Sequence, residues 1–245
     1  MSKSQDTRDG APKGHSVSPY YDLEHVAAQV RKGGHRARIG GAWDEIGRLQ
    51  FEYLRSHGLE PEMRLLDVGC GSLRGGVHFA RYLEVGHYYG IDLSQDLLDA
   101  GYDIELRQLG LQERVPRSNL LATAEFDAVG FGVVFDMLLA QSVFTHLTSN
   151  HIRLCLARMA DVTRPGSVFF ATVFLVPEGA DAWGPVQQPP AGIVSYPAAN
   201  PYHYRPADIA SWVTDLPWRP DSFEEWGHPR GQQMATFVRT DGSRR

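Results

Sequence analysis

From Met63 onward, short apolar runs alternate with segments in which apolar residues recur at helical spacing. Short apolar runs bounded by turn residues predict buried strands, whereas a period of about 3.6 residues predicts amphipathic helices. Strands are expected over residues 64–69, 87–92, 118–122, 134–141, 167–175, 219–225 and 232–239. Helices are expected over residues 74–84, 95–109, 149–163 and 206–213. This alternation predicts an α/β fold with a doubly wound, seven-stranded, mostly parallel sheet.

The chain before Met63 has a different pattern. Residues 1–18 are polar, with glycine and proline and no apolar period, so we expect a disordered tail there. Helices are expected over 20–31 and 42–57, separated by a glycine-rich basic loop at 32–41. We therefore divide the chain into a tail at 1–18, an N-terminal helical segment at 19–60 and one domain at 61–245.

Residues 177–205 interrupt the alternating pattern. They contain several prolines and glycines and the aromatic residues Trp183, Tyr202 and Tyr204. A stretch of this length without regular structure is uncommon in a compact domain unless it forms a lid or a binding segment. We therefore expect a substrate-binding insertion at 177–205.

The most informative local feature is the run LLDVGCGSLRGG from Leu65 to Gly76. An apolar strand leads into a glycine-rich turn that opens a helix. Glycines accept positive φ and let a ligand lie against bare backbone, whose free N–H groups are hydrogen-bond donors. Open α/β sheets bind ligands at the carboxyl ends of their strands. We therefore expect a nucleotide-like ligand at this turn.

Two acidic residues narrow the ligand class. A dinucleotide fingerprint has the spacing G-x-G-x-x-G, and here Gly75 comes one residue too late. Asp67, just before the turn, would repel a pyrophosphate but suits a ligand with an ammonium group. Asp92 ends the next strand, about twenty residues after the glycines, which is the spacing at which a carboxylate binds ribose hydroxyls.

These features resemble the first two motifs of the class I S-adenosylmethionine-dependent methyltransferases. The segment from Phe135 to Leu147 resembles the motif at the fourth strand of that family, and the resemblance spans about Leu65 to Phe174. It implies a Rossmann-like fold and S-adenosylmethionine as cofactor. The cofactor-binding residues that it implies are Asp67, Gly69, Cys70, Gly71, Asp92, Leu93, Phe126, Gln141, Ser142 and Trp43. A core position for Phe126 is the alternative to stacking on the adenine.

In small-molecule methyltransferases of this class, N-terminal helices commonly cover the cofactor. The resemblance therefore implies that residues 19–60 form a lid, with a hinge at Gly40-Gly41 and Trp43 above the methyl end of the cofactor. The alternative is that Trp43 anchors its helix on the sheet.

Methyl transfer mainly needs an aligned nucleophile and a site without water, but a hydroxyl nucleophile usually also needs a base. Candidate catalytic bases are His146, His203 and His228. Candidate substrate-binding residues are Tyr202, Tyr204, Trp183 and Arg230, the last because an arginine can bind a carboxylate or phosphate. The alternatives are a histidine bonded to backbone at His146, a packed aromatic loop at 202–204 and a solvated Arg230.

Composition sets limits on partners and location. The formal net charge of −5 and the pI near 6.0 argue against a nucleic-acid partner, which usually needs a basic face. No apolar segment approaches the length of a membrane span, and the first residues do not resemble a signal peptide. Cys70 and Cys155 form no disulfide framework, and the histidines lack metal-ligand spacing. We expect a cytoplasmic protein without a metal or a membrane partner.

The predicted function is methylation of an oxygen of a small polar metabolite, with nitrogen as the alternative atom and secondary metabolism as one setting. Two other classes stay open: a peptide or protein methyltransferase with an open groove at the insertion, and a non-catalytic binding module with the same fold. A nicotinamide-dependent oxidoreductase fits badly, because of the glycine spacing and Asp67. The oligomeric state is open, with a homodimer as one option.

Overall fold

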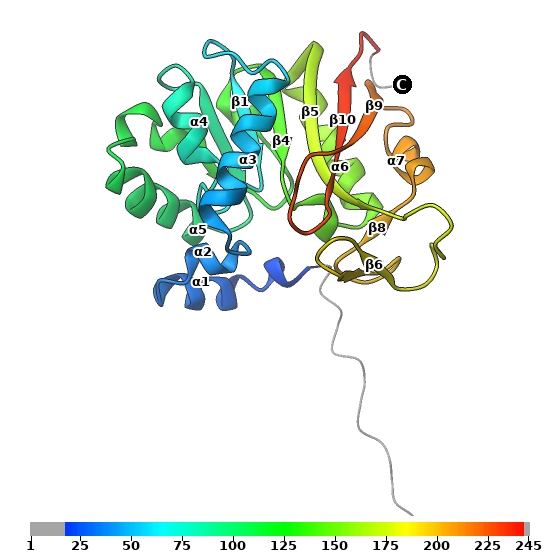
Figure 1. Ribbon diagram of the computed structural model, residues 1–245. Coiled ribbons are helices and arrows are strands. Elements are labelled where there is room, and N and C mark those ends of the chain that lie inside the picture. The colour runs from blue at the N-terminus through cyan, green and yellow to red at the C-terminus, as the bar shows by residue number, and fades with distance from the viewer. Residues whose placement is uncertain (1–17, 243–245) are drawn as a thin grey trace, which may run out of the picture.

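The computed structural model describes residues 18–242, whose core is a central sheet in the order β3-β2-β1-β4-β5-β10-β9 (Figure 1). The first five strands in this order pair in parallel, and β10 is antiparallel to both of its neighbours. The strands are β1 (Leu65–Val68), β2 (Tyr88–Asp92), β3 (Leu120–Ala122), β4 (Phe135–Ala140), β5 (Thr163–Leu175), β9 (Trp218–Glu225) and β10 (Gln233–Arg239). The predicted doubly wound, mostly parallel sheet is confirmed. It also has a short eighth strand, β8 (His203–Tyr204), which pairs in parallel with the end of β5.

Helices cover both faces of the sheet because neighbouring strand residues point to opposite sides. Leu65 and Met137 pack in one apolar cluster with α3 (Trp43–Ser56), α4 (Gly76–Tyr82) and α5 (Gln95–Ala100). Leu66 and Leu138 pack in a second cluster with α6 (Ser149–Asp161) and α7 (Pro206–Trp212). Single turns of 3₁₀-helix lie at Gln112–Arg114, Arg117–Asn119, Val129–Phe131 and Phe144–His146.

The N-terminal segment begins with η1 (Pro19–Tyr21), α1 (Leu23–Arg31) and α2 (His35–Arg38), and α3 completes it. The short helix α2 corrects the loop expected at 32–41. It is attached by a buried carboxylate, because His35 Nε2 lies 2.6 Å from Glu105 Oε1 and Arg36 donates two hydrogen bonds of 2.7 Å to Glu105. Glu105 lies in a π-helical turn, Gly101–Leu106, which interrupts the helix expected over 95–109.

Part of the predicted tail at 1–18 lies outside the described residues. Its last residue, Ser18, is buried and caps η1, where the side-chain oxygen accepts the N–H of Tyr20 at 3.3 Å. The division of the chain into tail, N-terminal segment and domain stays a prediction.

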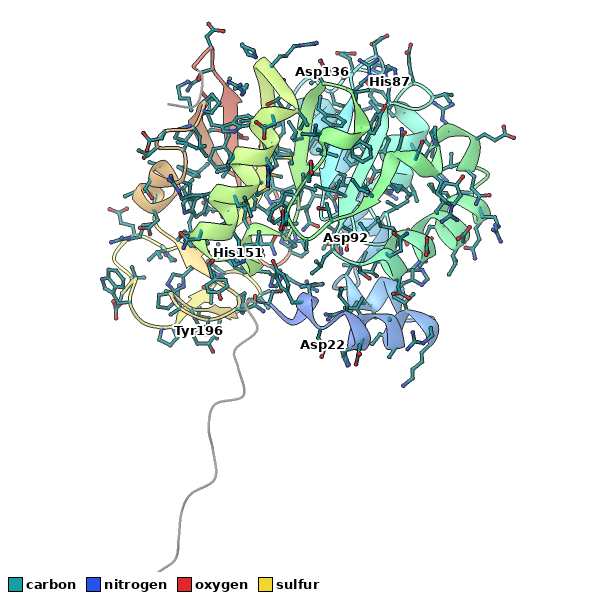
Figure 2. All side chains as sticks on the ribbon, turned by 180° about the vertical axis from the view of Figure 1, so that it is seen from behind. Asp22, His87, Asp92, Asp136, His151 and Tyr196 are labelled. Atoms are coloured by element: carbon teal, nitrogen blue, oxygen red, sulfur yellow. The ribbon has the colours of Figure 1, made fainter. Side chains whose placement is uncertain are left out.

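The insertion at 177–205 contains regular structure that the sequence pattern did not predict. A two-stranded antiparallel sheet pairs β6 (Val186–Gln188) with β7 (Ile193–Ser195), and β8 follows. Figure 1 shows α1, α2 and β6 along the same edge of the central sheet. In Figure 2, Asp92 lies toward this edge with Asp22 and Tyr196, whereas His87 and Asp136 lie at the opposite edge. The N-terminal segment and the insertion therefore gather at one end of the parallel strands. Within residues 18–242, no helix has the length and apolar character needed to cross a membrane.

Candidate functional site

A cavity opens at the carboxyl ends of β1, β2 and β4, where an open α/β sheet is expected to bind its ligand. The predicted cofactor residues line it, except Trp43, and so does one predicted base, His146. Sequence reasoning missed several lining residues. They are Ser18, Tyr20, Tyr21, Ile39, Gln50, Arg74, Gly75, Ile91, Leu97, Thr123, Ala124, Val143 and Leu147.

The glycine turn needs its glycines for both conformation and space. Gly69 and Gly71 have φ values of +72° and +55°, in the left-handed region that side chains rarely adopt. A Cβ on Gly69 would lie 2.4 Å from Val143 Cγ2, and one on Gly71 would lie 2.7 Å from Ile39 Cγ2. Ile39 follows α2, so the N-terminal segment packs directly on the turn.

Asp92 is fixed by backbone donors on both carboxylate oxygens. The N–H of Gly71 donates to Oδ2 at 2.8 Å and the N–H of Ser94 donates to Oδ1 at 2.9 Å. Burial raises the pKa of Asp92, while these backbone donors oppose the rise. Each oxygen keeps a further lone pair, so the carboxylate can accept hydrogen bonds from hydroxyl groups of a ligand in the cavity.

Asp67 occupies the floor of the cavity, with a residue exposure of only 3%. The hydroxyl of Tyr88 donates to its Oδ2 at 2.9 Å. Burial raises the pKa of Asp67 to about 7 despite this hydrogen bond. Near pH 7 the carboxyl of Asp67 is therefore partly protonated in the folded chain alone. A cation bound in the cavity would stabilise its charged form.

Arg74 is the most informative residue that sequence reasoning missed. It is 5% exposed, and its guanidinium donates to the carbonyls of Ile39 and Gly41 and, at 2.6 Å, to Gln141 Oε1. Burial lowers its pKa to about 10, and its Nε has no hydrogen-bond partner in residues 18–242. No carboxylate in that range forms an ion pair with Arg74. The signal in the sequence was a charge inside an otherwise small, apolar turn.

Gln141 and Ser142 end β4 in a network of side-chain contacts. The Gln141 amide nitrogen donates to Ser142 Oγ at 2.7 Å and lies 3.3 Å from His228 Nε2. Ser142 has a φ of +56°, and its N–H donates to Thr172 Oγ1 at 2.7 Å. These contacts hold the chain as it leaves the strand, so that both residues line the cavity beside the glycine turn.

His146 lines the cavity in a single turn of 3₁₀-helix after β4. Its Nδ1 lies 2.5 Å from Oδ1 of Asn200, and its ring contacts Tyr20 edge-on with centroids 5.2 Å apart. Burial lowers the pKa of His146, with a smaller opposing effect from the Asn200 hydrogen bond. Asn200 comes from the insertion, where no sequence motif singled it out.

The predicted residues of the insertion do not line the cavity. His203 is buried, with Nδ1 3.0 Å from Ser195 Oγ and Nε2 3.1 Å from the carbonyl of Ala182. Both ring nitrogens therefore hold the insertion together, and the position of His203 outside the cavity does not support its assignment as a catalytic base.

The aromatic residues of the insertion also lie outside the cavity lining. Tyr202 and Tyr204 stack at 6.5 Å in the apolar core, and the Tyr204 hydroxyl donates to the Leu147 carbonyl. Trp183 is 76% exposed beneath the guanidinium of Arg205. None of the three lines the cavity, so their assignment as substrate-binding residues is not supported by position.

Three other predicted residues, Trp43, His228 and Arg230, are also absent from the lining of the cavity. Trp43 packs under the Arg36 guanidinium, which lies 4.5 Å from the ring centroid, and it also contacts the apolar cluster that contains Leu65. His228 is buried beside Gln141, and burial lowers its pKa to about 4. Arg230 donates to the carbonyl of Gly40 at 2.5 Å. It therefore binds the N-terminal segment and is not simply solvated.

A resident metal ion has no candidate ligand cluster in the described part of the chain. No group of three or more His, Cys, Asp or Glu side chains in residues 18–242 is arranged to hold one. The charged groups of the cavity are instead Asp67, Asp92 and Arg74, which suit an organic ligand with both cationic and hydroxyl groups.

Comparisons with known proteins agree with this geometry. Residues 66–169 match a family model described as a methyltransferase domain. Among solved structures, the CcbJ methyltransferase from Streptomyces caelestis has a TM-score of 0.65 at 12% identity, over 92% of this chain and 100% of that chain. Magnesium protoporphyrin IX methyltransferase from Synechocystis PCC 6803, crystallised with S-adenosylhomocysteine, has a TM-score of 0.61 at 15% identity, over 89% and 100%.

A third solved structure, the 1,6-didemethyltoxoflavin-N1-methyltransferase from Burkholderia thailandensis, has a TM-score of 0.60 at 16% identity, over 94% of this chain and 95% of that chain. The chain therefore has the class I, Rossmann-like methyltransferase fold, with the match to the methyltransferase domain at residues 66–169.

Proposed function

We propose that this protein is an S-adenosylmethionine-dependent methyltransferase that methylates an oxygen of a small polar molecule. The observation that carries the proposal is the cavity in which Asp67 and Asp92 flank the glycine turn, with Arg74 between the turn and the end of β4. The fold and the family match support the transferase class, while the acceptor rests on the cavity itself.

The charged groups of the cavity fit the cofactor group by group. The ribose hydroxyls would donate to Asp92, whose oxygens are already oriented by Gly71 and Ser94. The α-ammonium group would face Asp67, whose buried carboxylate gains from a cation. The α-carboxylate would be bound by Arg74, which lacks an anionic partner in residues 18–242 and has an unpartnered Nε. Leu93, Leu97, Thr123, Ala124 and Phe126 would surround the adenine.

A dinucleotide fits the same cavity badly. Its pyrophosphate would lie at the glycine turn, close to the carboxylate of Asp67. Two like charges in a buried site repel each other strongly, because the local dielectric is low. The geometry thus supports the sequence argument against a nicotinamide cofactor.

The cover of the cavity supports a small acceptor. Ser18, Tyr20, Tyr21 and Ile39 line the cavity from the N-terminal segment. That segment is tied down at Glu105 and at the carbonyls that Arg74 and Arg230 bind. A segment that covers part of the cavity limits the access of water and supports a metabolite rather than a peptide as the acceptor.

His146 is the base of the proposed reaction. Nδ1 is engaged by Asn200, and no hydrogen bond to Nε2 is formed in residues 18–242. When bound, the cofactor supplies a methyl group already activated on a sulfonium. His146 would accept the proton of the acceptor hydroxyl, whose electron pair forms the new bond to the methyl carbon while the carbon–sulfur pair returns to sulfur. A neutral amine needs no such base, so a cavity-lining histidine favours oxygen as the methylated atom.

Calorimetric titration of the full chain tests the cofactor assignment. We expect micromolar binding of S-adenosylhomocysteine and no binding of NAD⁺ under the same conditions. Binding of NAD⁺ alone, or of neither ligand, would refute it.

Transfer of a radiolabelled methyl group to a panel of phenols, hydroxy acids, amines and peptides then tests the acceptor class. We expect labelling of a hydroxyl compound, and loss of turnover in His146→Ala with cofactor affinity retained. His151→Ala is the matched control, because His151 lies outside the cavity lining at the start of α6. Tight binding without transfer to any compound would instead indicate a non-catalytic binding module.

A further inference from the structure

The closest polar contact of the proposed base is with a residue far away in the chain. Nδ1 of His146 lies 2.5 Å from Oδ1 of Asn200, which is 54 positions later. An amide oxygen only accepts hydrogen bonds, so Nδ1 carries the proton and donates it. The neutral ring then has its lone pair on Nε2, which is the atom that can accept a proton.

Backbone contacts hold Asn200 beside the 3₁₀ turn of His146. The N–H of Tyr202 donates to the carbonyl of Thr145 at 2.8 Å, which joins the two segments next to the histidine. The N–H of Tyr196 donates to the carbonyl of Pro201 at 2.9 Å and closes the loop that carries Asn200. Tyr196 lies toward the same edge of the molecule as Asp92 in Figure 2. These backbone hydrogen bonds therefore hold Asn200 of the insertion at the edge of the cavity.

The partner of His146 is the neutral amide of Asn200, which adds no negative charge that would favour a protonated ring. A carboxylate at this position would stabilise the imidazolium and favour the protonated form. The other groups that face the ring are Tyr20 from η1, Arg38 from α2 and Arg230 from the β9–β10 connection. Burial and the two arginine charges lower the pKa of His146, which favours the neutral ring.

We propose that Asn200 is a positioning residue that holds His146 in the tautomer with Nε2 free to accept a proton, so that the insertion at 177–205 completes the base. This inference rests on the proposed function for its catalytic consequence, although the tautomer itself is independent of any activity. The insertion then acts through Asn200 rather than through the aromatic residues and the histidine that the sequence singled out.

The test is ¹⁵N NMR of the full chain labelled at its histidine rings, with the His146 signals assigned by their loss in His146→Gln. In the wild-type chain we expect the His146 signals of a ring protonated on Nδ1. In Asn200→Ala we expect them to move toward the tautomer protonated on Nε2. Asn150→Ala is the matched control, because Asn150 is exposed at the start of α6 and should leave the His146 signals unchanged. A His146 ring protonated on Nε2 in the wild type, or no change in Asn200→Ala, would overturn the proposal.

Asn200→Asp keeps the acceptor and adds a charge, so it separates positioning from folding. We expect this variant to retain the Nδ1-protonated ring and to raise the pKa of His146, moving the acidic limb of the kcat profile to higher pH by about one unit. For Asn200→Ala we expect kcat to fall about 10- to 100-fold with the Kd of S-adenosylhomocysteine unchanged. An unchanged kcat in Asn200→Ala, or an unchanged profile in Asn200→Asp, would contradict the catalytic part.

Failure of the proposed function has a different signature. A chain that binds no S-adenosylhomocysteine, but still shows the tautomer change in Asn200→Ala, would refute the methyltransferase assignment and leave the role of Asn200 toward His146 intact. The two proposals therefore fail by separate measurements.

Discussion

Arg74 donates a 2.6 Å hydrogen bond to the side-chain oxygen of Gln141, and so joins the glycine turn after β1 to the end of β4. The two residues are 67 positions apart, and both line the cavity. The same guanidinium donates to the carbonyl of Gly41, so one buried charge connects the turn, the strand end and the N-terminal segment. Burying an arginine beside neutral acceptors alone lowers the stability of the fold, because the charge loses its hydration. An anionic ligand group would offset this loss.

Arg74→Met keeps an unbranched, flexible side chain but removes the guanidinium and its charge. We expect binding of S-adenosylhomocysteine to weaken by about 1.5–3 kcal/mol in free energy, as for loss of a charged hydrogen bond. The affinity for 5′-methylthioadenosine, which lacks the amino-acid portion, should hardly change. Arg81→Met on the exposed side of α4 is the control. Equal losses for both ligands in calorimetry would mean that Arg74 only supports the turn.

Asp92→Ala tests the ribose contact. We expect it to weaken binding of S-adenosylhomocysteine by about 1–3 kcal/mol, because the ligand hydroxyls and the N–H groups of Gly71 and Ser94 lose their acceptor. Calorimetry gives the affinity, and circular dichroism checks that the substitution has not unfolded the chain. Asp99→Ala, which removes an exposed carboxylate paired with Arg117, should bind like the wild type. Unchanged affinity in Asp92→Ala would refute the assignment.

Asp67 predicts a pH dependence of binding. Burial raises its pKa to about 7, so a bound ammonium group should draw the carboxyl into its charged form and release a proton near neutral pH. The affinity for S-adenosylhomocysteine should therefore increase from about pH 6 to pH 8. Calorimetry in buffers of different ionisation enthalpy measures the released proton. Asp67→Asn should bind more weakly and lose this dependence, and a full dependence in that variant would exclude Asp67 as its source.

The same carboxyl predicts a change in stability. Its folded pKa lies above the unfolded value of about 3.9, so between about pH 4 and pH 7 the folded state binds more protons than the unfolded state. The contribution of Asp67 to the free energy of unfolding thus declines as pH rises through this window. Asp67→Asn keeps an acceptor for the Tyr88 hydroxyl and should raise Tm at pH 8 relative to the wild type. A lower Tm at pH 8 in thermal unfolding would contradict the argument.

Glu105→Gln should loosen the N-terminal segment. The buried carboxylate of Glu105 accepts two hydrogen bonds from the half-exposed Arg36 and contacts His35, so a neutral amide weakens a charge-assisted contact at a cost of about 1–3 kcal/mol. We expect faster tryptic cleavage after Arg36 and Arg38 and faster release of S-adenosylhomocysteine. Asp103→Asn, in the same turn but in an exposed pair with Arg107, is the control. Equal cleavage rates in the two variants would show that Glu105 is not the attachment point.

Much of the fold followed from local pattern. Apolar runs with turn residues between them located β1, β2, β4 and β10 to within a residue or two, because a strand buried on both faces is mostly apolar. The glycine turn and Asp92 were also recognisable, since positive φ and the spacing from glycine to acid are properties of the chain itself.

In the insertion, the local sequence pattern did not predict where the side chains lie. Tyr202, Tyr204, Trp183 and His203 were chosen for their chemistry, yet the fold uses them in packing, in holding the insertion or on the surface. The pairing of β8 with the end of β5 involves two residues of each strand, too few to leave a periodic signal. A loop is placed by contacts with distant segments, and composition does not encode those contacts.

The sequence by itself thus determined the doubly wound, mostly parallel kind of sheet, the glycine turn and the acids that flank it. These features depend on periodicity and on backbone conformation over neighbouring residues. Only the tertiary structure decided that Arg74 meets Gln141, that Glu105 holds the N-terminal segment, and that Asn200 meets His146. Each of these contacts joins side chains more than fifty positions apart, and such pairs are brought together by the packing of whole elements rather than by any local preference of the chain.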